Sequence, residues 1–99
     1  MTNDQQQAIL EILRNHREVL AEMGVHTLAL FGSAVRGELR PDSDIDLLVD
    51  IEPPYTFDRY IRVKFYLEDL LGRPVDLVMS KTLKSRVRPY VEKEAVYVP

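Results

Sequence analysis

The chain has no cysteine among its 99 residues, which excludes disulfide bonds and metal centres with thiolate ligands. It also lacks an apolar run close to the roughly 20 residues that a membrane-spanning helix needs, so we expect no membrane partner. Residues 1–7 are polar and do not contain the apolar core of a secretory signal peptide. Together these absences predict a cytoplasmic protein.

Basic residues are not in excess either, because 16 Asp and Glu outnumber 13 Lys and Arg and leave a formal net charge of −3. General binding to nucleic acid needs a basic surface that displaces counterions from phosphates, so this charge argues against direct nucleic-acid binding. What is present is the composition of a globular protein, with 45% apolar and 29% charged residues. The length predicts one domain, 1–99, that can bury a single core.

Hydrophobic periodicity predicts helices that alternate with strands along the chain. Apolar residues three and four positions apart are typical of helices, and apolar runs bounded by turn residues are typical of strands. The alternation predicts an α/β layer, although periodicity does not determine the order of the strands. The predicted helices are 3–23, 57–71 and, with an interruption near Pro89, 83–93, with a short helix or turn at 34–37; the predicted strands are 25–31, 45–51, 75–79 and 95–98.

A tight turn, Gly32-Ser33, comes directly after the first predicted strand. Glycine lets the backbone approach a phosphate because no side chain stands in the way. Ser33 adds a hydroxyl and a backbone N–H, and both can donate to phosphate oxygens. Arg36 lies within reach of a triphosphate, although a solvated arginine of the turn is an equally good interpretation. A lone Gly-Ser pair is more often a plain strand-to-helix turn, so a phosphate-binding interpretation needs support from residues farther along the chain.

Ten residues separate Ser33 from Asp44, which with Asp46 stands at the head of the second predicted strand. Side chains two apart on a strand share one face, and two anions side by side repel each other unless a cation lies between them. Mg²⁺ prefers carboxylate oxygens and often completes its shell with phosphate. The pattern predicts a turn that approaches a phosphate, together with a metal site; the alternative is a strand end with two solvated carboxylates. Asp50 lies on the same face of the predicted strand as Asp44 and Asp46 but farther along that strand, and we interpret it as structural or solvated.

Gly32-Ser33, Gly37 and the run from Ser43 to Val49 resemble the signature of the polymerase β-type nucleotidyltransferases. The short length makes the chain most similar to the minimal nucleotidyltransferases, the antitoxins of HEPN/MNT toxin–antitoxin pairs. The resemblance extends from about residue 28 to the C-terminus, because Asp76, between apolar neighbours on the third predicted strand, fits the third carboxylate of that fold. It implies a small mixed sheet with helices on one face and the carboxylates on the other.

The resemblance also implies an activity. Such enzymes use Mg²⁺, with two ions expected here, and ATP as co-substrate, and they add AMP to a tyrosine of the cognate HEPN ribonuclease toxin. The residue matching Asp76 binds the catalytic metal and helps to deprotonate the attacking hydroxyl. Two alternatives stay open: an antitoxin that neutralises the toxin by complex formation alone, and nucleotidyl transfer to a small molecule. The expected site residues are Asp44, Asp46 and Asp76 for catalysis and metal binding, and Gly32, Ser33 and Arg36 for nucleotide binding.

Overall fold

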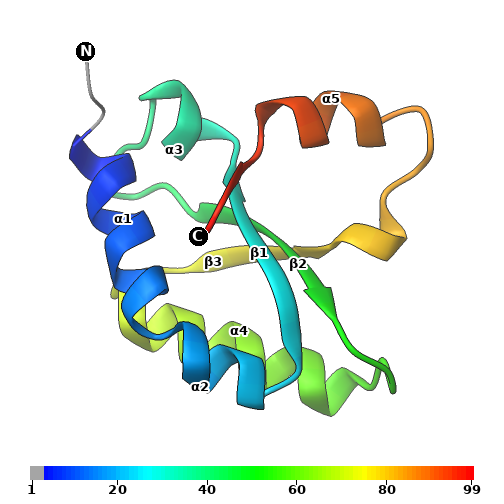
Figure 1. Ribbon diagram of the computed structural model, residues 1–99. Coiled ribbons are helices and arrows are strands. Elements are labelled where there is room, and N and C mark those ends of the chain that lie inside the picture. Colours follow the sequence, from blue (N-terminus) through cyan, green and yellow to red (C-terminus); the bar gives the residue numbers. More distant parts are fainter. Residues whose placement is uncertain (1–3) are drawn as a thin grey trace.

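The computed structural model describes residues 4–99 and is built around a mixed sheet of four strands (Figure 1). The strands are β1 (Val25–Phe31), β2 (Ile45–Ile51), β3 (Val75–Met79) and β4 (Val96–Tyr97), in the order β3-β2-β1-β4. Strand β1 runs antiparallel to both β2 and β4, whereas β2 and β3 are parallel. The small mixed α/β sheet that the sequence predicts is thereby confirmed.

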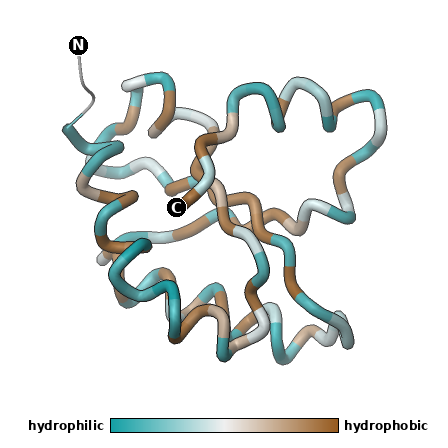
Figure 2. Tube along the Cα trace, viewed as in Figure 1, coloured by the Kyte–Doolittle hydropathy of each residue, from teal (hydrophilic) through white to brown (hydrophobic). Residues whose placement is uncertain are grey.

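Helices α1 (Asp4–Asn15), α2 (Arg17–Glu22) and α4 (Phe57–Leu71) cover one face of this sheet (Figure 1). Because side chains alternate along a strand, every second residue of β2 points into this layer. Figure 2 shows strands that are mostly apolar along their length and helices that alternate between apolar and polar residues. The β2 members of the resulting hydrophobic cluster are Ile45, Leu47, Val49 and Ile51, each at most 2% exposed.

Local signals in the sequence define both ends of α4. The side chain of Thr56 accepts a hydrogen bond from the backbone N–H of Arg59 at 3.2 Å, which satisfies one of the free donors of the first turn. Gly72 ends the helix in the left-handed conformation, with φ 68°, which glycine adopts without steric cost. The predicted helix 57–71 is therefore confirmed with the predicted bounds.

Two side chains of α4 hydrogen-bond to the outer edge of β3. The carboxylate of Glu68 accepts the backbone N–H of Val75 at 2.9 Å, and the hydroxyl of Tyr60 donates to the carbonyl of Leu77 at 2.7 Å. An edge strand exposes such groups as a template for further strands unless something covers them. Helix α4 therefore packs against the core and also occupies the edge of the sheet.

The single helix predicted over 3–23 is wrong, because two helices occupy this range. The chain departs from helical geometry at His16, with φ −109° and ψ 15°, and the His16 ring lies 3.2 Å from the hydroxyl of Tyr66. In α2, Leu20 is buried, whereas the neighbouring Val19 is 41% exposed. The predicted start of the helix at residue 3 lies outside the described residues.

The helix predicted over 83–93 is also only partly correct. A short 3₁₀ helix, η1 (Ser80–Thr82), is followed by irregular chain at 83–87, and α5 (Arg88–Glu94) begins after it. Pro89 lies in the first turn of α5, where the N–H that proline lacks is not needed, so a helix begins there rather than running through. The last strand is shorter than the predicted 95–98. No helix among residues 4–99 is both long and apolar enough to cross a bilayer.

Candidate active site

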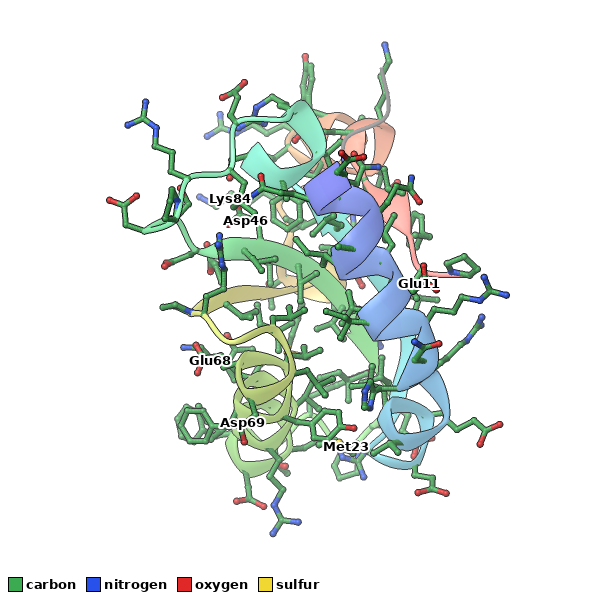
Figure 3. All side chains as sticks on the ribbon, turned by 90° about the vertical axis from the view of Figure 1, so that its left-hand side faces the viewer. Glu11, Met23, Asp46, Glu68, Asp69 and Lys84 are labelled. Atoms are coloured by element: carbon green, nitrogen blue, oxygen red, sulfur yellow. The ribbon has the colours of Figure 1, made fainter. Side chains whose placement is uncertain are left out.

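Two of the predicted carboxylates, Asp46 and Asp76, lie on the sheet face opposite α1, α2 and α4, and Asp44 directly precedes β2. Asp46 alternates with the buried residues of β2 and therefore faces the other side of the sheet. The parallel register pairs it with Asp76 on β3. On its other side Asp46 pairs with Phe31, the last residue of β1, so the turn at Gly32 comes directly after this pair. Figure 3 shows Asp46 near the start of β2, below the turn that contains α3 (Ser33–Arg36). Strand pairing thus brings Gly32, Asp46 and Asp76 to one end of the sheet.

Gly32 permits a close approach between the turn and Asp46. Its φ is 73°, and a Cβ at this position would lie 2.1 Å from Oδ2 of Asp46, too close for any side chain. Both the backbone conformation and the space therefore require glycine here. The backbone N–H of the next residue, Ser33, lies close enough to the Asp46 carboxylate to lower its pKa. The Gly-Ser turn therefore lies directly against Asp46, a contact that we did not infer from the sequence.

The electrostatics of the site centre on Asp46. Burial raises the pKa of Asp46 above its ordinary value, the charges of Asp76 and Asp44 raise it further, and so does a hydrogen bond with the Asp76 side chain. The Ser33 N–H opposes this rise because it favours the charged carboxylate. Asp46 is half-buried, whereas Asp44 and Asp76 are exposed. Three acidic groups therefore repel one another at an end of the sheet that solvent reaches.

This arrangement suits a hard divalent cation. Carboxylate oxygens are the ligands that Mg²⁺ prefers, and a cation would relieve the repulsion that raises the pKa of Asp46. Among residues 4–99, however, no three His, Cys, Asp or Glu side chains already converge tightly enough to surround one ion. The protein part of the site is thus an incomplete shell around Asp46, as expected where Mg²⁺ takes further ligands from phosphate or water.

Arg36, the last residue of α3, is held by two carboxylates. Its Nη1 lies 2.8 Å from Oε1 of Glu94, and its Nε lies 3.3 Å from Oε1 of Glu38. The negative charge of Glu94 is the main cause of a raised pKa at Arg36. The same Glu94 oxygen accepts the backbone N–H of Gly32 at 2.8 Å. Arg36 is therefore an organised part of the turn rather than a freely solvated side chain.

Sequence reasoning missed Glu94 because its partners are distant along the chain. The charged stretch at the end of the last predicted helix gave no local reason to separate Glu94 from its acidic and basic neighbours. Asp50, by contrast, lies apart from the site as expected. It pairs with Thr27 near the other end of β2, and the nearly buried Leu48 separates it from Asp46.

Known proteins resemble this chain in both sequence and structure. Residues 13–98 match the family model of the nucleotidyltransferase domain. The protein adenylyltransferase MntA of Thermococcus cleftensis is 47% identical over 91 residues, which cover 91% of this chain and 92% of that protein. A solved minimal nucleotidyltransferase structure shares 44% identity and a TM-score of 0.74, covering 88% of this chain and 93% of that chain. A complex of a tri-AMPylated Shewanella oneidensis HEPN toxin with its MNT antitoxin contains a similar fold, with TM-score 0.65 and 19% identity over 95% of this chain and 71% of that chain.

Proposed function

This chain belongs to the nucleotidyltransferase family, and we propose that it is a Mg²⁺-dependent antitoxin enzyme that transfers AMP from ATP to a tyrosine hydroxyl of a cognate HEPN toxin. The observation that carries the proposal is the placement of Asp46 between the Gly32-Ser33 turn and Asp76. The relative at 47% identity is a protein adenylyltransferase, which supports a protein acceptor. The AMPylated HEPN toxin in the structurally similar complex supports the kind of partner.

The proposed roles depend on the position of each side chain. Asp44, Asp46 and Asp76 would hold Mg²⁺, which when bound neutralises triphosphate charge and increases the acidity of the acceptor hydroxyl. The Ser33 hydroxyl and the Arg36 guanidinium are proposed to bind phosphate oxygens. Because most catalysis in such phosphate chemistry is positioning and charge neutralisation, the organised turn around Asp46 is the main contribution of the chain.

Asp76 is proposed to receive the proton of the acceptor hydroxyl. It is exposed at the start of β3 and faces Asp46, so an acceptor from outside can reach it. As the proton moves to Asp76, the acceptor oxygen forms a bond to the α-phosphorus of ATP and the bond to the bridging oxygen breaks. Pyrophosphate leaves, and AMP remains on the acceptor. The toxin is thereby silenced, and we propose that this occurs in the cytoplasm.

Intact-mass measurement of the native partner co-purified with this chain tests the proposal. After incubation with ATP and Mg²⁺, we expect the partner to gain one or more AMP units with wild-type protein and none with Asp44→Asn. Asp50→Asn is the matched control, because it removes a carboxylate from the same strand away from the site, and it should transfer AMP normally.

Each alternative gives a different result in the same experiment. An unmodified partner in a stable, neutralised complex would replace the proposal with antitoxin action by binding alone. Label from α-labelled ATP that appears in a small-molecule fraction instead of the partner would favour a small-molecule acceptor. Modification of the partner that survives Asp44→Asn would contradict the roles assigned to the carboxylates.

A further inference from the structure

The pairing of β4 with β1 places Glu94 beside the Gly-Ser turn. Leu30 pairs with Val96 and Ala29 pairs with Tyr97, so each step forward on β1 is a step back on β4. Gly32 directly follows β1, and Glu94 ends α5 two residues before Val96. The pairing of Val96 with Leu30 therefore brings the end of α5 beside the turn.

One oxygen of Glu94 joins two parts of the turn. Oε1 accepts the backbone N–H of Gly32 and lies on Nη1 of Arg36, both at 2.8 Å. The side chain of Glu94 is 33% exposed, whereas that of Glu38, the other carboxylate on Arg36, is 63% exposed. Hydrogen bonds between charged groups are stronger when solvent is partly excluded, so Glu94 is the firmer of the two anchors.

The two carboxylates determine the orientation of the guanidinium. With Nη1 on Glu94 and Nε on Glu38, two of its three nitrogens are engaged, and a planar group held at two points cannot rotate freely. Nη2 is then the nitrogen presented to an incoming oxyanion. An arginine fixed in this way loses less conformational entropy when it binds a phosphate than a mobile one does.

We propose that Glu94 is a positioning residue for the nucleotide: it holds Arg36 and the start of the Gly32-Ser33 turn in the arrangement that receives the triphosphate of ATP. This inference rests on the function proposed above. The same contacts could also describe an internal carboxylate that competes with the triphosphate. We favour positioning because the pairing of β4 with β1 keeps the backbone of Glu94 within reach of the turn, and because one oxygen of its side chain contacts both Gly32 and Arg36.

The affinity of the full chain for AMP-PNP with Mg²⁺, measured by isothermal titration calorimetry, tests this role. Loss of one charge-assisted anchor should make Glu94→Ala bind about tenfold more weakly, as should Arg36→Ala. Because Glu94 acts partly through Arg36, the double variant should lose less affinity than the sum of the two single losses. Glu94→Gln, whose amide oxygen can still accept both hydrogen bonds, should recover part of the loss. In the transfer assay KM for ATP should rise in Glu94→Ala while kcat stays within about twofold.

Glu92→Ala is the matched control on the same helix. Among residues 4–99, Glu92 forms only an exposed pair with Arg88 at 3.8 Å, so its removal should leave nucleotide affinity unchanged. Thermal unfolding of each variant separates loss of binding from loss of fold, and Glu94→Gln covers the case in which Glu94→Ala does not fold.

Three results would overturn the inference. Equal or tighter binding by Glu94→Ala would show a competing carboxylate, and fully additive losses in the double variant would show that Glu94 acts independently of Arg36. An equal fall in kcat and in affinity with no recovery in Glu94→Gln would show a purely structural role. If the wild-type protein binds no AMP-PNP, the proposed function fails together with this inference. If the wild-type protein binds AMP-PNP and the Glu94 variants bind it equally well, only the inference about Glu94 fails and the proposed function stands.

Discussion

The two faces of the sheet share the same strands but differ in what their side chains do. On the covered face, alternate residues of β2 such as Leu47 and Val49 are fully buried among apolar neighbours. On the open face, Asp46 is half-buried beside two other carboxylates, and its pKa is raised by that environment. The covered face therefore stabilises the fold, whereas the end of the other face that holds Asp46 maintains repulsion that a ligand can relieve. Burial elsewhere in the fold offsets the cost of this unfavourable site.

The largest expected effect on stability is on the covered face. Leu47→Ala should lower the free energy of unfolding by about 3 kcal/mol, because it removes buried apolar surface and leaves a cavity at a residue that is 0% exposed. Chemical denaturation measures this loss. Val19→Ala, at a side chain that is 41% exposed, should change stability by less than about 0.5 kcal/mol. Equal effects of the two substitutions would contradict the assignment of the core.

Gly32→Ala tests the junction between the faces. A Cβ in this conformation is strained and meets Asp46, so we expect a loss of about 1–3 kcal/mol in unfolding free energy and loss of AMP transfer. Denaturation and the transfer assay measure the two effects. Gly72→Ala is the control: φ is also positive there, but no atom of the described residues 4–99 lies within 4 Å of the added Cβ, so it should cost less and retain transfer.

Asp46→Asn should have a smaller effect of the opposite sign. Because the pKa of Asp46 is raised on folding, the native protein binds more protons than the unfolded chain, and stability falls as pH rises from the ordinary aspartate value, about 4, through the raised one. Above that window and without Mg²⁺, Asp46→Asn should therefore unfold at a higher temperature than wild type.

Thermal unfolding at several pH values checks this sign. The advantage of Asp46→Asn should disappear below the ordinary aspartate pKa, where the wild-type carboxyl is protonated in both states. Added Mg²⁺ should raise the Tm of wild type but not that of Asp46→Asn. A variant that is less stable than wild type at neutral pH would show that Asp46 is stabilised, not strained, by its surroundings.

The smallest expected effect is away from both faces. Arg62 and Asp58 form an i,i+4 pair on α4 at 3.1 Å, with side chains 74% and 76% exposed. Arg62→Ala should therefore lower the unfolding free energy by no more than about 0.5 kcal/mol, and less in high salt. Urea denaturation at two salt concentrations measures it, and a loss above about 1 kcal/mol would indicate a further contact.

The sequence predicts an element or a site residue well when neighbouring residues determine its position, and poorly when residues far along the chain do. The strands 25–31, 45–51 and 75–79 are confirmed because each apolar run is bounded by its own turn residues. The break at His16 escapes prediction because the spacing of apolar residues fits a straight helix as well as a bent one. The carboxylates and the Gly-Ser turn are local motifs, whereas Glu94 belongs with them only through strand pairing, which periodicity does not reveal.

The register that places Glu94 also sets where the chain can change in length. Only Ala95 stands between Glu94 and the pairing of Val96 with Leu30, so gaining or losing one residue there would move Glu94 relative to Gly32 and Arg36. Residues 83–87 form no part of the register, and an insertion there would leave it intact. We therefore expect related sequences to vary in length before α5 but not between α5 and β4.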